Sequence, residues 1–110
     1  MRITLCGSAR FEHDFKEHNK RLTLAGHVIY SLAAYPSDFG GKDWYTEEQK
    51  QILDKVHKLK IDNSDAILVL NLDGYIGSST RSEINHAIAM NKEVFYLYPE
   101  ISGVSGAQRI

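Results

Sequence analysis

Apolar residues along this chain fall into two patterns: short uninterrupted runs, and positions spaced three or four apart. The runs predict strands, and the spaced positions predict amphipathic helices. The clearest run is Ala66 to Leu70, within the stretch DAILVLNL, and it is typical of a central parallel strand buried on both faces. Shorter runs predict three more strands, at residues 3–6, 27–35 and 93–98.

Three amphipathic helices are expected between these strands. Their apolar positions are Phe11, Phe15, Leu22 and Ala25 in the first helix, Ile52, Val56 and Leu59 in the second, and Ile84, Ala87 and Ile88, with Asn91 as a further candidate, in the third. Gly26 is the expected end of the first helix. Thr46, followed three residues later by Gln49, predicts a capping box at the start of the second helix.

The alternation of strands and helices predicts an α/β fold with a small three-layer parallel sheet of four to five strands, Rossmann-like or flavodoxin-like. The expected strand order is 2-1-3-4. Residues 1–98 should form one domain, followed by a Gly- and Ser-rich tail at 99–110. With this order, ligands bind where the first and third strands end, so the segments CGSARF and NLDGYIGSSTRSE should meet there.

Composition narrows the classes of function. The 110-residue chain is 43% hydrophobic and 25% charged, as in a soluble globular protein, and no apolar run approaches the roughly 20 residues of a membrane span. A formal net charge of −1 without clustered Lys and Arg argues against a nucleic-acid partner. The segment HKLKI at 57–61 has the pattern of the solvated side of a helix. One cysteine and no signal-peptide core predict a cytoplasmic protein.

The histidines do not predict a metal site. His13 and His18 are five residues apart, which misses a shared helix face, and the other histidines are scattered. Cys6, at a strand end beside a glycine, is expected to be a small buried core residue. Neither a metal nor a cofactor is therefore expected.

The first loop, CGSAR, can form an anion site. Gly7 allows a tight turn and a close approach of a ligand, Ser8 can cap the following helix, and Arg10 can bind a phosphate or carboxylate. An equally weighted alternative is that Ser8 only caps the helix and Arg10 is solvated. Phe11 can stack on a base or belong to the core.

The second loop is hydroxyl-rich and leads to Glu83. Its polar and flexible residues are Asp73, Gly74, Gly77, Ser78, Ser79 and Thr80. Thr80 and Glu83 have capping-box spacing, so Glu83 can be a structural cap. Alternatively, a carboxylate ionised at a helix N-terminus can act as a nucleophile. The aromatic pair Trp44–Tyr45, in the long loop PSDFGGKDWY, can be a lid over the site or an oligomer contact.

The segments ITLCGSAR, NSDAILVLNLDGY and SSTRSEINHAIAMNKEVFYL together resemble the nucleoside 2-deoxyribosyltransferase superfamily, including its nucleotide (5′-monophosphate) N-glycosidases. The resemblance covers roughly Arg2 to Leu97. The family pattern Gly-Thr-x-x-Glu-x-Gly-x-Ala carries the nucleophile, and residues 79–87 match it at Thr80, Glu83 and Ala87. Ser79 and Asn85 replace its glycines.

The resemblance implies that Glu83 attacks the anomeric carbon of a nucleoside or its 5′-monophosphate. Gly7, Ser8, Arg10, Ser78 and Ser79 would surround the sugar or phosphate. His57 stands where many members have an aspartate that contacts the base, and Gly77 where many have Asp or Ser, so the base and the phosphate stay open.

Asp73, Asp65, Tyr75 and Tyr30 are candidates to protonate the leaving base or hold the sugar, with Asp73 preferred as a catalytic residue. The resemblance also implies a homodimer or larger homo-oligomer. The alternative function is a non-catalytic nucleotide-binding or nucleotide-sensing module on the same scaffold, and a purely structural oligomerising domain is a third.

Overall fold

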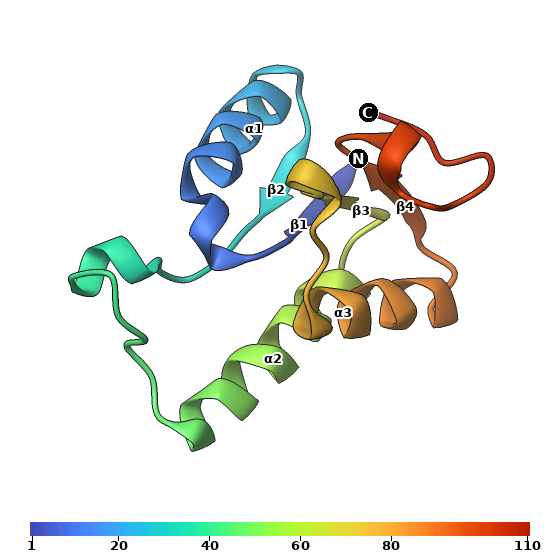
Figure 1. The fold of residues 1–110 in the computed structure, drawn as a ribbon. Helices are drawn as coiled ribbons and strands as arrows, with labels where there is room; N and C mark the ends of the chain where they lie inside the picture. Colours follow the sequence, from blue (N-terminus) through green and yellow to red (C-terminus); the bar gives the residue numbers. More distant parts are fainter.

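The computed structural model describes all 110 residues and has one four-stranded parallel sheet. The strands are β1 (Arg2–Cys6), β2 (Val28–Tyr30), β3 (Ala66–Val69) and β4 (Glu93–Tyr96), and they lie in the order β2-β1-β3-β4 (Figure 1). The predicted fold class and strand order are confirmed. Leu5 of β1 pairs with Leu68 of β3, which fixes the central register.

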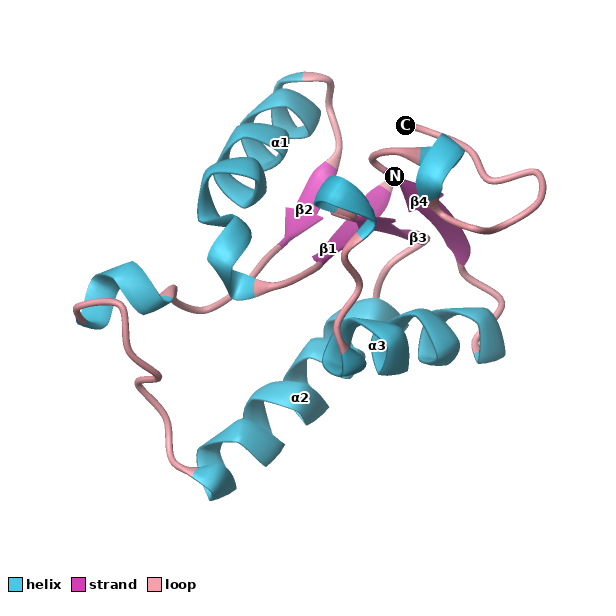
Figure 2. Ribbon diagram, in the orientation of Figure 1, coloured by secondary structure: helices cyan, strands magenta, loops and turns pink.

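Three helices cover the sheet in two layers (Figure 2). The helix α1 (Glu12–Leu24) lies on one face, and α2 (Glu47–Asp62) and α3 (Ser78–Ala89) lie on the other. Alternate residues of each strand pack into two separate cores, because successive side chains of a strand point to opposite faces of the sheet. Leu5 and Leu68 pack with α1, whereas Cys6 and Val69 pack with α2 and α3.

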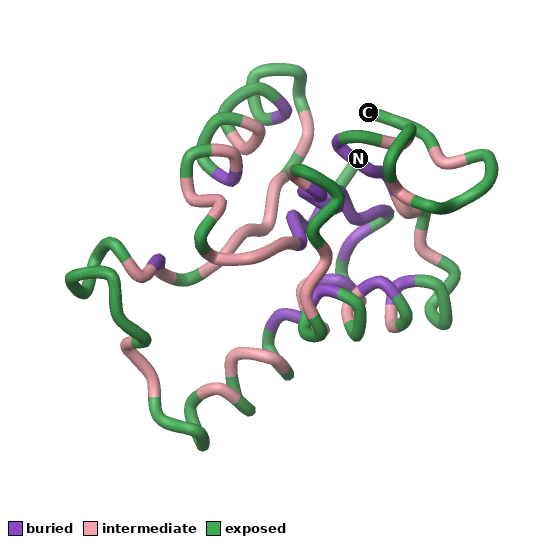
Figure 3. The backbone as a smooth tube through the Cα atoms, in the orientation of Figure 1, coloured by how far each residue is buried: buried purple, intermediate pink, exposed green.

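The buried residues are concentrated in the central strands and on the inner sides of the helices (Figure 3). Every residue of β3 is buried, as the apolar run predicted. The capping box of α2 is also present: Thr46 Oγ1 accepts from the Gln49 amide at 3.1 Å, and Gln49 Oε1 accepts from the Thr46 amide at 2.9 Å.

Two predictions about the first half of the fold are wrong. The second strand is only three residues long, because the chain leaves the sheet after Tyr30. The expected apolar stripe of α2, formed by Ile52, Val56 and Leu59, faces solvent. The helix instead buries His57 and Ile61, so the segment 57–61 is not a solvated face.

The third helix also differs at its end. Ile84 and Ala87 are buried as expected, but Ile88 is exposed. Asn91 follows the helix with a positive φ of 58°, so it belongs to the turn before β4 and not to the apolar face.

Residues 99–110 fold back onto the sheet. The Tyr96 amide donates to the carbonyl of Gln108 at 2.9 Å, so this segment pairs with the outer edge of β4. Ile110 packs against the core that contains Phe95 and Leu97. No helix in the structure has the length and apolar character of a membrane span.

Candidate active site

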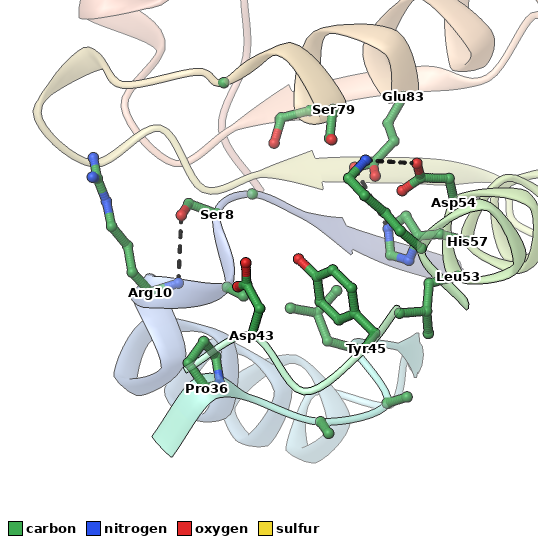
Figure 4. Close-up of a pocket in the computed structure, with 18 of the residues that line it drawn as sticks. Ser8, Arg10, Pro36, Asp43, Tyr45, Leu53, Asp54, His57, Ser79 and Glu83 are labelled. Atoms are coloured by element: carbon green, nitrogen blue, oxygen red, sulfur yellow. Dashed lines mark hydrogen bonds and ion pairs between the residues drawn. The ribbon is translucent and has the colours of Figure 1, made fainter. Parts of the chain in front are cut away.

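A cavity of about 480 Å³ lies at the carboxyl ends of β1 and β3, at the predicted switch point. Four segments form its walls: the turn after β1, the long loop between β2 and α2, the inner side of α2, and the segment leading into α3 (Figure 4). The two loops singled out in the sequence do meet in this pocket.

Glu83 lies in the pocket wall, and its side chain is 13% exposed. The helix α3 begins at Ser78 with Gly77 as its N-cap, so Glu83 is in the second turn. Thr80 is buried inside the helix and is not an N-cap. The capping-box interpretation of Glu83 is therefore wrong, and so is the expectation that a helix N-terminus keeps this carboxylate ionised.

Glu83 belongs to a buried cluster with Cys6 and His57. Nε2 of His57 is 3.7 Å from Oε1 of Glu83 and 3.7 Å from Sγ of Cys6. The three side chains come from different elements: Cys6 ends β1, His57 is on α2, and Glu83 is on α3. Figure 4 shows the His57 and Glu83 side chains converging from facing helices.

Burial is the main influence on the protonation of the carboxyl group. It raises the pKa of Glu83 from 4.5 to about 7, and the negative charge of Asp54 adds to the rise. A hydrogen bond with Cys6 and the positive charges of Lys58 and Lys50 act in the opposite direction. Near neutral pH the carboxyl is therefore divided between its acid and its anion, and either form is available for chemistry.

His57 and Cys6 stay uncharged at the same pH. Burial, followed by the charge of Lys60, lowers the pKa of His57 from 6.5 to about 4, although a hydrogen bond with the backbone of Leu5 opposes the change. Burial, followed by Glu83, raises the pKa of the Cys6 thiol well above its ordinary value. The distance between His57 and Glu83 fits an ion pair, but desolvation keeps the imidazole neutral, so this is a polar contact.

The rim of the pocket carries a cation without an acidic partner. The Arg10 guanidinium lies 4.1 Å from the centroid of the Tyr75 ring and 5.2 Å from that of Phe11. The stacking holds the guanidinium at the rim and leaves its N–H groups free for an anion. Ser8 Oγ accepts from the Arg10 amide at 3.4 Å, so Ser8 does cap the turn while also lining the cavity.

The start of α3 forms another part of the rim. Gly77, Ser78, Ser79 and Thr80 all line the cavity. The first amides of a helix have no intrahelical acceptor, and Gly77 provides no side-chain cap. These amides and the two serine hydroxyls give the pocket hydrogen-bond donors for an anionic or hydroxyl-rich ligand.

Gly7 has a steric reason to be glycine. A Cβ atom at this position would lie 3.2 Å from Cβ of Leu70 and 3.3 Å from its carbonyl oxygen. The turn after β1 therefore packs directly on β3, and this close approach brings Ser8 and Arg10 to the pocket.

Nine of the twelve residues predicted for the site line this cavity: Gly7, Ser8, Arg10, His57, Gly77, Ser78, Ser79, Thr80 and Glu83. The structure does not place Asp73, Asp65 or Phe11 there. Asp73 lies in the turn Leu72–Gly74 with a positive φ of 54°, outside the cavity wall. Phe11 packs edge-on against Tyr75, with centroids 6.2 Å apart.

Asp65 is on the wrong side of the sheet for the predicted role. It precedes β3 at the amino end of the sheet, where its carboxylate accepts from the Arg2 amide at 2.7 Å. The pocket is at the carboxyl ends of the strands, so Asp65 stabilises the sheet at the opposite edge. Tyr30 is also outside the cavity, whereas Tyr75 lines it.

The acidic and basic residues on the wall formed by the long loop and α2 were not predicted from the sequence. Asp43, Lys50 and Asp54 line the cavity, and Lys50 Nζ is 3.0 Å from Asp54 Oδ2. Trp44 and Tyr45 also line it, which is the position expected of a lid. The signal for this wall was the concentration of aromatic and acidic residues in PSDFGGKDWY.

Aromatic packing orders the loop. Trp44 stacks on Phe39 with centroids 5.4 Å apart, and Tyr45 packs edge-on against Trp44, also at 5.4 Å. In Figure 4 the Tyr45 hydroxyl points into the cavity.

Two solved structures share this fold. The 2-deoxyribosyltransferase of the psychrotolerant bacterium Bacillus psychrosaccharolyticus aligns with a TM-score of 0.61 and 17% identity, over 87% of this chain and 71% of that one. The Clostridium botulinum CMP N-glycosidase BcmB aligns with a TM-score of 0.54 and 19% identity, over 100% of this chain and 87% of that one.

Protein-family models and curated protein sequences give no match to this chain. At 17% and 19% identity, the likeness to the two solved structures is one of fold.

Proposed function

We propose that this chain is an enzyme of the nucleoside 2-deoxyribosyltransferase superfamily, and that it cleaves or transfers at the N-glycosidic bond of a nucleoside or its 5′-monophosphate. The observation that carries the proposal is the position of Glu83: a shielded carboxyl group, opening into a cavity at the switch point of a parallel sheet. The fold shared with a deoxyribosyltransferase and a CMP N-glycosidase supports it.

In this mechanism the ionised Glu83 is the nucleophile. One carboxylate oxygen forms a bond to the anomeric carbon while the bond from that carbon to the base breaks, and the electron pair leaves with the base, which takes up a proton. Water or a second base then attacks the anomeric carbon, and the ester bond to Glu83 breaks. The pKa of about 7 means that the nucleophilic form is well populated at neutral pH.

The residues at the rim of the pocket are suited to binding a phosphate group of the substrate. Aromatic packing holds the Arg10 guanidinium, which has no carboxylate partner, and Arg10 lines the same pocket as the free amides and hydroxyls at the start of α3. Guanidinium groups and helix N-termini both bind phosphate well. We therefore prefer a 5′-monophosphate substrate, with its phosphate between Arg10 and Ser78–Ser79.

The function also includes self-association. The helix α2 leaves Ile52, Val56 and Leu59 exposed on one side, and Val56 also lines the pocket. A second copy of the chain covering this stripe would bury apolar surface and close the open side of the cavity.

The decisive experiment is chromatographic detection of free base. Purified protein, treated with a chelator, is incubated with a panel of nucleosides and 5′-monophosphates, with and without a second base. The variant Glu83→Gln keeps the size of the side chain but cannot attack. Glu48→Gln, an exposed glutamate on α2 without an ion pair, is the matched control.

The expected result is base release by the native protein and by Glu48→Gln, and none by Glu83→Gln. Dependence on a second base would identify a transferase. Tight binding of an intact nucleotide with no release across the panel would identify the sensing module instead. If the protein neither binds a nucleotide nor releases a base, the purely structural role is the remaining function.

A further inference from the structure

We propose that Cys6, His57 and Glu83 form a binding site for one Zn²⁺ ion at the base of the pocket. The donor atoms of these three side chains, one thiol sulfur, one imidazole nitrogen and one carboxylate oxygen, all lie within 4.8 Å of one another. The site was not expected from the sequence, because its members are 51 and 26 residues apart and show no ligand spacing.

The chemical nature of the donors selects the metal. Thiolate and imidazole together favour Zn²⁺ over Mg²⁺ or Ca²⁺, which prefer oxygen ligands. A set of three protein ligands with a fourth open position is the usual arrangement of a zinc site that exchanges water or a small molecule. The cluster therefore matches zinc in both the type and the number of its ligands.

The distances agree with tetrahedral coordination. Zinc bonds of about 2.3 Å to sulfur and about 2.0 Å to nitrogen or oxygen place neighbouring donors roughly 3.3–3.6 Å apart. Here the sulfur-to-nitrogen and nitrogen-to-oxygen distances are both 3.7 Å. These two pairs need only a small contraction, and the third pair, the sulfur and the carboxylate oxygen, lies within 4.8 Å.

The surroundings hold the donors in place. Cys6 and His57 are buried, and each comes from an element packed in the core, so their side chains have little freedom to lose on binding. His57 is neutral, as a metal ligand must be. The thiol proton of Cys6, and that of Glu83 where present, would pass to solvent when the ion binds.

The fourth position opens to the cavity. His57 and Glu83 line the pocket, whereas Cys6 lies beneath them and does not. A bound ion would take the carboxylate of Glu83 as a ligand and so withdraw it from attack. This consequence, that zinc inhibits base release, rests on the proposed function, whereas zinc binding itself does not.

The test measures binding without any nucleotide. Chelator-treated protein is titrated with Co²⁺, a coloured substitute for zinc, and the near-ultraviolet thiolate-to-cobalt absorption is recorded. Zn²⁺ affinity is measured by competition with a chromophoric chelator. The variants are Cys6→Ala, His57→Gln and Glu83→Gln. His86→Gln is the control, because His86 forms a partly buried contact with Asp62 at 2.7 Å and is not one of the three donors.

We expect one ion per chain, no thiolate band in Cys6→Ala, and an affinity for Zn²⁺ about tenfold or more lower in His57→Gln and Glu83→Gln. His86→Gln should bind like the native protein. Circular dichroism checks that each variant folds, and if Cys6→Ala does not, the other two carry the test.

Absence of binding at micromolar Zn²⁺, or affinity retained in all folded site variants, would overturn the zinc site. Base release by the chelator-treated protein is a separate result, so the site and the proposed reaction can fail independently.

Discussion

Replacing Glu83 with glutamine should make the protein more stable at neutral and alkaline pH while removing its proposed activity. The folded protein holds the proton of Glu83 up to a pKa of about 7, whereas an ordinary glutamate loses it near 4.5. Between these values the folded state binds more protons than the unfolded chain, so native stability falls as the pH rises. Glutamine does not ionise, so the Glu83→Gln variant does not lose stability in this way.

The size of the effect follows from the two pKa values. Each unit of pKa corresponds to about 1.4 kcal/mol, so the rise in the pKa of Glu83 from 4.5 to about 7 lowers the free energy of unfolding by about 3 kcal/mol when the group is ionised. The side chain is 13% exposed, so solvent screening reduces this only slightly. The advantage of Glu83→Gln should be absent at about pH 4, appear as the pH rises through 4.5, and be complete above about pH 7.

His57 changes the native stability in the opposite sense. Its pKa is lowered from 6.5 to about 4, so the stability it contributes is lost as the pH falls through this range. In the native protein, the contributions of Glu83 and His57 therefore oppose each other over this pH range. Subtracting the native curve from the Glu83→Gln curve removes the part of the histidine contribution that the two proteins share.

The assay is urea unfolding of both proteins at about pH 4, 6 and 8, followed by circular dichroism. Local packing changes caused by the amide group alter the free energy of unfolding by the same amount at every pH. The ionisation of Glu83 is therefore tested by how the difference in unfolding free energy between the variant and the native protein varies with pH. A difference that does not vary with pH, or one that decreases toward pH 8, would show that the carboxyl group is not desolvated as described.

Four further predictions concern the reaction and the fold. Because only ionised Glu83 attacks, kcat/KM for base release should rise about tenfold per pH unit below the pKa of about 7 and level off above it. A flat profile between about pH 5 and 8 would contradict the role of Glu83 as the nucleophile. Arg10→Gln should raise KM for 5′-monophosphates about tenfold and leave nucleosides unaffected, and equal effects on both would remove its phosphate role. Thr46→Ala removes the acceptor of the Gln49 amide and should lower the free energy of unfolding in urea by about 1 kcal/mol. An unchanged free energy of unfolding would show that this cap does not stabilise α2. Light scattering should give the mass of two or more chains, reduced to one chain by Leu59→Glu; a native mass of one chain contradicts self-association.

The sheet was predictable because its signals are local. The apolar run from Ala66 to Leu70 is long enough to identify a strand buried on both faces, and the alternation with helices then restricts the topology to parallel crossovers. The start of α2 was equally local, since Thr46 and Gln49 satisfy each other within one turn.

The buried face of α2 was not predictable in the same way. Hydrophobicity alone assigns Ile52, Val56 and Leu59 to the core, yet the helix buries His57. The imidazole tolerates burial because Cys6 and Glu83, from distant parts of the chain, are beside it. Which face of a helix is buried depends on its partners, and those are set by the tertiary structure.

Glu83 illustrates how one residue can fit two patterns. Its spacing from Thr80 fits a capping box, and only the position at which α3 begins decides between the two interpretations. The helix starts at Ser78, two residues before Thr80, which moves Glu83 out of the first turn. The pocket wall that contains Asp43 and Tyr45 depends on how a long loop folds over α2. The aromatic and acidic composition of the loop marks it as a candidate wall, but does not encode that fold.

The pairing of Gln108 with β4 has a consequence for behaviour at high concentration. An uncovered strand edge offers free amides and carbonyls to the same edge of another molecule, which is a common route to aggregation. Here the returning segment occupies the amide of Tyr96, and the opposite edge, β2, has only three residues. Removing residues 107–110 should therefore uncover this edge and the core surface under Ile110, and produce a protein that precipitates on concentration.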